Sequence, residues 1–454
     1  MTHMTSYNPA YLPPAPAGYY YVSEIPANDP YEKRFPTFLG MISALYFVSV
    51  CALARYSTDV SWVPQVIGGL LGGAWIVVGL FALGQPVRWC KPITLFVLYA
   101  LWGTTGMMVT INFEYYFIIW KTIIKIMMVT WVVMQCVKTR KDYLTCCFFV
   151  GVAAIVILIQ GMDNILQAVS FESDKDESFN AARVTGLLIG NANNLGIFGV
   201  VSLVCSTACL LGLRSVILRT VCVGSMVSAL YIVAASGSRT AMVGVLVAAV
   251  SVYFYQFRKS GGGALAMSGG IGKKITIAVI TLMLVGGAVY YVRNLPFFFR
   301  LADVLSSREK MEEEPRYQYF KAALGAVIQH PVVGLGWGGF ALAKFGTNQD
   351  RQGQYSHSSV SETLSTAGIP GFLLFYGALF ALFRLLLRIR KLSLSRADKT
   401  AVNMILVHVT VLTLLSVIAV LDRDRLNWPL IGAACGYLWN LDRTYGRAPA
   451  YAPS

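Results

Sequence analysis

Residues 143–162 read YLTCCFFVGVAAIVILIQGM, twenty residues in a row without a charged side chain. A helix rises about 1.5 Å per residue, so this stretch is long enough to cross about 30 Å of hydrocarbon. The basic segment KTRKD (138–142) precedes it, and the acidic segment 163–184 comes after it. Because Lys and Arg accumulate in cytoplasmic loops, the pattern predicts a transmembrane helix that starts on the cytoplasmic side.

The whole chain has this apolar character. It has 454 residues, of which 56% are hydrophobic and only 13% charged, and its mean hydropathy is +0.60. Soluble proteins carry about a quarter of charged residues, so a soluble fold is excluded. We predict an all-α integral membrane protein with about twelve transmembrane helices. The predicted spans are 36–55, 62–84, 92–111, 113–137, 143–162, 185–212, 216–235, 240–257, 275–292, 359–383, 400–421 and 427–441.

The charges of the connecting loops predict the orientation. Lys and Arg gather in every second connection, at 84–91, 138–142, 213–219, 257–274 and 384–399. The net charge of +15 is therefore typical of an inner-membrane protein and does not indicate a nucleic-acid partner. Both termini are predicted to be cytoplasmic. The predicted parts are a disordered cytoplasmic tail (1–34), transmembrane helices one to nine (35–292), a large periplasmic loop (293–357), helices ten to twelve (358–441) and a cytoplasmic tail (442–454).

The long loop contains one segment with helical periodicity. It reads PRYQYFKAALGAVIQHPVVGLGWGGF (315–340), with apolar residues at helical spacing from Tyr319 to Val327, followed by a glycine-rich turn. This pattern predicts an amphipathic helix near the outer boundary between membrane and water. His330 is expected to end that helix before Pro331.

Four residues that could carry chemistry fall on or near the predicted outer face: Arg183, Arg239, Arg316 and His357. Guanidinium groups bind a diphosphate through paired hydrogen bonds and stabilise its developing charge. A histidine, with a pKa near neutrality, accepts the proton of an attacking hydroxyl. Each residue also has a structural interpretation: Arg239 as an interfacial arginine, Arg316 in a local ion pair, Arg183 paired with the acidic stretch before it, and His357 as a surface or capping residue.

Other catalytic patterns are missing from the sequence. It has no P-loop, no HExxH, no Gly-x-Ser-x-Gly and no paired CxxC motifs. The closest candidate for a metal site is LDRDR (421–425), where arginines would neutralise the two aspartates. The nine cysteines have no metal-ligand spacing and are expected to be small buried side chains. We therefore predict neither a metal nor another cofactor.

Four segments, in order, resemble the O-antigen ligase and O-antigen polymerase superfamily of bacterial membrane enzymes. They are RVTGLLIGNANNLG (183–196), SGSRTA (236–241), residues 316–340 of the loop, and HSSVSETLSTAGIPG (357–371). Three positions depart from the pattern: Ala192 stands where proline is usual, Ser358 where asparagine often follows the histidine, and Thr366 where a later glutamate is found.

The resemblance implies a glycosyltransferase fold of the C type and transfer with inversion at the anomeric carbon. The donor would be a glycan on undecaprenyl diphosphate, and the acceptor would be lipid A core or a growing glycan chain. It further implies that Arg239 and Arg316 contact the diphosphate, with Arg183 beside them, and that His357 activates the acceptor hydroxyl. Asn193 and Glu362 are expected to support these residues. The predicted location is the bacterial inner membrane, among membrane lipids, with the active site facing the periplasm.

The competing prediction is a transporter or flippase for a lipid-linked or anionic solute. Such a protein would place ionisable residues deep in its spans, and Lys121 and Lys125 are the two candidates. They lie four residues apart and therefore on one helical face. Structural pairing, or contact with a lipid phosphate, is the alternative explanation for both.

Overall fold

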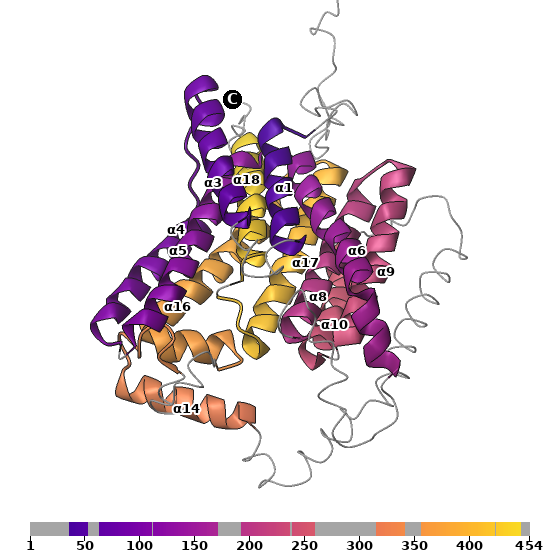
Figure 1. Cartoon of the computed structure of the whole chain (residues 1–454). Helices are drawn as coiled ribbons and strands as arrows, with labels where there is room; N and C mark the ends of the chain where they lie inside the picture. The colour runs from indigo at the N-terminus through magenta and orange to yellow at the C-terminus, as the bar shows by residue number, and fades with distance from the viewer. Residues whose placement is uncertain are drawn as a thin grey trace, which may run out of the picture. The chain divides into compact units, whose positions relative to one another are not determined.

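The computed structural model describes residues 36–52, 63–110, 112–170, 192–236, 238–258, 315–340, 356–422 and 424–445. They all belong to one compact unit that begins at Pro36. Every regular element within these ranges is a helix (Figure 1). The predicted tail 1–34, the predicted span 275–292 and Arg183 lie outside the described residues.

The first half of the chain forms helices that correspond to the predicted spans. Their bounds are α1 Phe38–Ala52, α3 Val63–Ala74 with the π-helical continuation η2 Trp75–Ala82, α4 Lys91–Thr104 with the 3-10 turn η3 Thr105–Met108, α5 Phe113–Cys136 and α6 Arg140–Ser170. The second half contains α8 Ala192–Gly212, α9 Val216–Ser236, α10 Arg239–Val252 with η4 Tyr253–Arg258, α14 Pro315–Gln329, α16 Ser359–Ile389, α17 Arg396–Ile418 and α18 Asn427–Tyr445.

The predicted all-helical architecture is confirmed for the described ranges and is consistent with a membrane protein, whereas the number of spans stays a prediction. Seven helices in the described ranges are long and apolar enough to cross a membrane, and two further apolar helices, Phe38–Cys51 and Thr240–Gln256, are shorter. Large apolar side chains point outward from several of them, as membrane-facing surfaces require; Phe81 on η2 and Leu101 on α4 are two examples. Eight of the nine cysteines are buried, and all nine are free thiols.

Close helix contacts hold the unit together. The helix pairs with the most extensive contacts are α8 with α9, α5 with α18, α1 with α6, and α4 with α16. Gly432 and Gly436 explain how α18 approaches α5, because a Cβ atom at either position would collide with carbonyl oxygens of Thr130 or Met134. Small residues at such crossings allow two helix backbones to pack directly.

The helix α16 covers the predicted span 359–383 and is bent. Gly368 has φ 67° and ψ −173°, outside the helical region, and Pro370 follows two residues later. The bend separates the polar segment 359–367 from the apolar remainder. This segment contacts the far end of α17, since Ser359 Oγ donates to the carbonyl of Ala419 at 2.9 Å.

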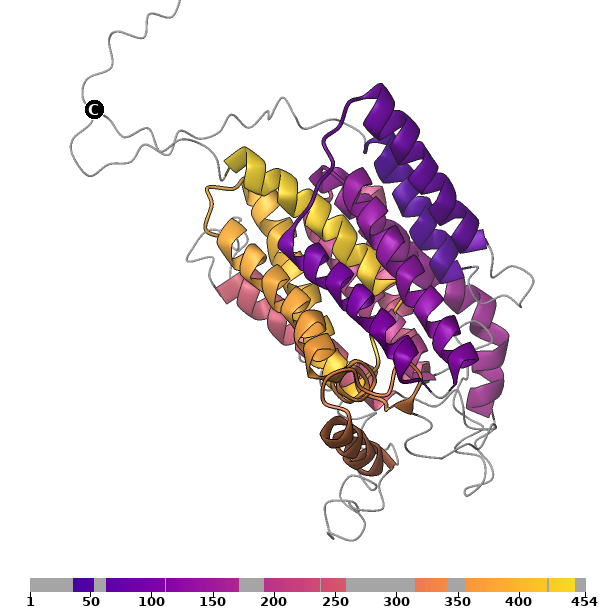
Figure 2. The same ribbon diagram turned by 90° about the vertical axis from the view of Figure 1, so that its left-hand side faces the viewer.

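The packing defines two ends of the bundle. We call the end where α16 begins and α17 finishes the His357 end, and the end where α4 begins and α16 finishes the Lys91 end. The helix α14 contacts α16 and lies at the His357 end (Figures 1 and 2). On this helix Ala323 and Ala326 are buried, while the apolar residues Tyr317, Leu324 and Ile328 are exposed; its amphipathic role at a membrane boundary stays a prediction. An exposed apolar stripe suits the predicted place at a membrane boundary.

Candidate active site

His357 occupies the turn that opens α16 and is half-buried. Its φ angle is +60°, which makes it the one non-glycine residue of the described ranges in the left-handed region. This conformation costs a residue with a Cβ atom roughly 1–2 kcal/mol, so neighbouring contacts must hold it in place.

Glu362 supplies one of those contacts from the first turn of α16. The side chain is 1% exposed, and its Oε2 accepts a hydrogen bond from the backbone N–H of Ser356 at 3.0 Å. Ser358 caps the helix, because its Oγ accepts from the N–H of Ser361 at 3.4 Å. The residues on both sides of His357 are therefore anchored to the helix that follows.

Ser359 ties the same turn to the end of α17. Its Oγ donates to the Ala419 carbonyl at 2.9 Å and accepts from the N–H of Leu421 at 2.7 Å. Since one hydroxyl satisfies two backbone groups of another segment, the position of the turn is determined by tertiary packing and not by local preference.

The ring of His357 lies against Tyr319 of α14. The two ring centroids are 5.5 Å apart, and the ring planes are inclined by 30°. Residue 316 precedes Tyr319 by three positions, about one turn of α14. The helix that bears Arg316 is thus in direct contact with His357. Sequence reasoning missed Tyr319, although its spacing from Arg316 is a signal that could have identified it.

The glycine-rich turn after α14 fastens that helix to the bundle. Gly334, Gly336 and Gly338 all have positive φ angles. Trp337, between them, is fully buried, and its ring stacks near Tyr116 with centroids 6.1 Å apart. The N–H of Leu335 donates to the carbonyl of Ser365, and the N–H of Ile369 to that of Pro331, each at 2.9 Å. Trp337 also fills the space beside Gly103, near the point where α4 passes into the 3-10 turn η3.

Arg239 is the first residue of α10, and the structure explains how its position is fixed. The N-cap residue Ser238 accepts a hydrogen bond from the N–H of Ala241 at 3.3 Å. The same hydroxyl donates to Oδ1 of Asn193, in the first turn of α8, at 3.0 Å. Asn193 therefore acts on the helix terminus that carries Arg239. Ser238 belongs to the SGSRTA segment, but sequence reasoning gave its side chain no separate role.

The termini that carry Arg239 and His357 lie at the same end of the bundle. The helix α10 runs antiparallel to α17, since Gly244 faces Leu415 while Gln256 bonds to Thr400 near the other end. The start of α10 is consequently beside the finish of α17, which Ser359 contacts. The structure thus brings the chain positions of Arg239, Arg316 and His357 to the His357 end.

Several other residues have structural roles. α14 ends at Gln329, so the prediction that His330 follows the helix end is confirmed. His408 is buried within α17, and its Nε2 lies 3.3 Å from Oδ1 of Asn427. Lys125 donates to Gln65 at 2.8 Å, and Lys121 lies 4.2 Å from the ring centroid of Phe117. These contacts favour the structural explanation for both lysines.

The described residues place the imidazole of His357 at the same end of the bundle as the helix starts that carry positions 239 and 316. No group of three or more His, Cys, Asp or Glu side chains within the described ranges could hold a metal ion. In general an imidazole can accept a proton, and the N-terminus of a helix favours a nearby anion.

A comparison with known protein families agrees with the resemblance seen in the sequence motifs. Residues 224–376 match the O-antigen ligase family. The matched segment is about a third of the chain, and it contains Arg239, Arg316, His357 and Glu362. The resemblance to the O-antigen ligase and polymerase superfamily is thereby confirmed, and at the level of this family it supports an enzyme of glycosyltransferase type. No curated protein matches the chain.

Proposed function

We propose that the protein is a membrane glycosyltransferase that moves a saccharide from undecaprenyl diphosphate to an acceptor hydroxyl on the periplasmic side, with inversion and without a metal. The observation that carries the proposal is the pairing of His357 with Tyr319 on α14, one helical turn after Arg316. The start of α10, which bears Arg239, lies at the same end of the bundle.

In the proposed reaction the acceptor oxygen attacks the anomeric carbon while its proton passes to a ring nitrogen of His357. The bond between that carbon and the diphosphate oxygen breaks, and the leaving group takes the electron pair. Arg239 and Arg316, with Arg183 as a third candidate, stabilise the charge that develops on the diphosphate. Guanidinium groups suit this role because they stay charged and offer paired donors.

The arrangement around His357 supports the role of a base. A left-handed backbone held by Glu362 and Ser359 fixes where the imidazole points. A fixed base is ready to accept a proton without reorganising during the reaction. Asn193, through Ser238, would fix Arg239 in the same way.

The test is transfer by the purified full-length protein from an undecaprenyl-diphosphate saccharide, with a chelator present. His357→Ala, Arg239→Ala and Arg316→Ala should each lower the rate at least about 100-fold, the usual contribution of a general base or a charge-stabilising donor. His330→Ala is the matched control for the histidine, and Arg219→Ala, at the Lys91 end, is the control for the arginines; both should keep the parent rate.

Two outcomes would contradict the proposal. Transfer that persists in all three site variants would remove the assigned residues, and a rate that collapses with chelator would remove the metal-free mechanism. The acceptor separates a ligase from a polymerase: a ligase extends lipid A core, whereas a polymerase extends another glycan repeat.

A further inference from the structure

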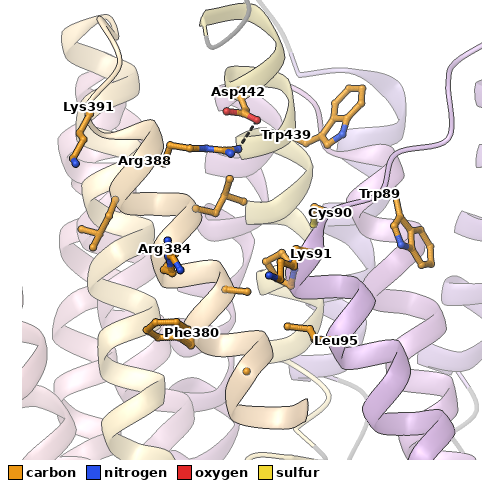
Figure 3. Close-up of a pocket in the computed structure, with 15 residues that line it drawn as sticks. Trp89, Cys90, Lys91, Leu95, Phe380, Arg384, Arg388, Lys391, Trp439 and Asp442 are labelled. Atoms are coloured by element: carbon orange, nitrogen blue, oxygen red, sulfur yellow. Dashed lines mark hydrogen bonds and ion pairs between the residues drawn. The ribbon is translucent and has the colours of Figure 1, made fainter. Parts of the chain in front are cut away.

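A cavity of about 980 Å³ opens at the Lys91 end, between α4, α16 and the last turns of α18 (Figure 3). Its position is remote from His357, because the straight part of α16 from Gly371 to Arg384 alone spans about 20 Å. Four basic side chains line it, together with one acid and several apolar residues. These basic residues are Lys91, Arg384, Arg388 and Lys391.

The lining changes from basic to apolar along the helices. Arg388 lies in the last turn of α16 and Lys391 just beyond it, whereas Gly377 and Phe380 come about two to four turns earlier. On α4 the order is the same, with Lys91 at the start and Leu95 one turn further into the bundle. The exposed apolar surface continues in the same direction on α16, where Phe380 is 62% and Leu373 61% exposed. The cavity is therefore charged at one end and open to an apolar environment at the other.

The charges of the cavity are unbalanced. Asp442 is the single acid of the lining, and Arg388 binds it at 2.6 Å (Figure 3). Within the ranges that the structure describes, no carboxylate pairs with Lys91, Arg384 or Lys391. The start of α4 adds to the positive field, since first-turn N–H groups of a helix point outward. Cys90 is the N-cap residue of α4, and its thiol contacts Met134 Sδ at 3.7 Å. The first-turn N–H groups of α4 therefore have no capping side chain at this position.

A buried arginine keeps the wall of the cavity in place. Arg88 donates to the carbonyl of Val137 at 2.9 Å and lies 5.5 Å from the ring centroid of Trp439, which lines the cavity. Burial lowers the pKa of Arg88 to about 10, so the guanidinium remains charged at neutral pH. The segment that leads into Lys91 is thus anchored to α5 and α18, and the cavity is a built feature of the fold.

We propose that this cavity binds a two-chain phospholipid with an anionic headgroup. The phosphate would meet Lys91, Arg384 and Lys391, and the acyl chains would lie along Leu95, Phe380 and the apolar face of α16. Charge complementarity supports an anion, because three of the four cations have no carboxylate partner in the described part of the chain. The gradient from basic to apolar selects a lipid over a soluble anion.

The test uses the purified full-length protein in detergent and measures bound lipid by native mass spectrometry. Phosphatidylglycerol should bind more tightly than phosphatidylcholine with the same chains. The variant Lys91→Ala/Arg384→Ala/Lys391→Ala should lose on the order of 100-fold in affinity for phosphatidylglycerol, at about fivefold for each basic residue. Gly377→Leu should weaken binding of the lipid without changing any charge, because it fills the apolar part.

A matched control removes the same number of positive charges elsewhere: Arg214→Ala/Arg219→Ala/Lys399→Ala, all exposed. It should bind phosphatidylglycerol like the parent. The proposal is overturned if the control loses as much affinity as the cavity variant, if the two phospholipids bind equally, or if inorganic phosphate displaces the lipid at similar concentration. Should the triple variant fail to fold, Lys91→Gln and Arg384→Gln separately test the same charges.

Discussion

Gly368→Ala is the substitution that examines the link between the long loop and α16 most directly. With φ 67° and ψ −173°, Gly368 occupies a backbone region that is essentially restricted to glycine. A Cβ atom there would also collide with the carbonyl of Val332 and lie 2.8 Å from that of Pro331. The latter carbonyl accepts the N–H of Ile369 at 2.9 Å. The substitution therefore strains the bend and separates α16 from the end of α14.

The expected magnitude follows from these two contributions. The backbone conformation costs alanine about 2 kcal/mol, and the disrupted hydrogen bond adds about 1 kcal/mol. We expect the free energy of unfolding to fall by roughly 3 kcal/mol. Transfer activity should fall as well, because Tyr319 would no longer be held against His357.

Gly377→Ala is the matched control in the same helix. A Cβ atom at Gly377 meets only Leu95 Cδ1, at 3.7 Å, which is ordinary contact. Alanine should stabilise this helical position by up to about 1 kcal/mol. Thermal unfolding in detergent and transfer activity are measured for both variants. If Gly368→Ala and Gly377→Ala have the same midpoint and the same rate, the argument from the bend is refuted.

Three further predictions concern the support of the site. Glu362→Ala should reduce the free energy of unfolding by about 2 kcal/mol, because the N–H of Ser356 loses its acceptor. Glu362→Gln keeps an acceptor oxygen and should reduce it by less, and chemical denaturation of both variants measures the difference. Tyr319→Phe should keep the parent rate while Tyr319→Ala lowers it about fivefold, reflecting a ring contact of about 1 kcal/mol, and equal rates would exclude a role for the ring. Asn193→Ala and Ser238→Ala should not be additive, because their side chains share one hydrogen bond; a double-mutant cycle on transfer activity that shows simple additivity would disprove the coupling.

The glycine series after α14 has two separate physical tasks. Gly334, Gly336 and Gly338 allow the chain to turn with positive φ angles. Their lack of side chains also lets Trp337 enter the bundle between Tyr99 and Tyr116. The packing of Trp337 fixes the turn that follows α14. Because α14 leads directly into this turn, the helix is held at the His357 end.

The sequence by itself determined the helical membrane architecture, because the length of apolar stretches is a local property that the thickness of the bilayer selects. It also indicated His357 and the arginines, through motifs and their place on one predicted face. The end of α14 near His330 followed from Pro331, which cannot continue a helix.

Only the tertiary structure decided how the segments that carry His357, Arg239 and Arg316 are arranged. The bend at Gly368, the left-handed turn at His357, the ring of Tyr319 beside it and the Asn193–Ser238 bond all depend on contacts between segments far apart in the chain. The cavity at the Lys91 end is of the same kind, since Lys91 and Arg384 come from helices nearly three hundred residues apart. Such contacts leave no periodic signal in the sequence, because each depends on the packing of the partner helix and not on the residues beside it.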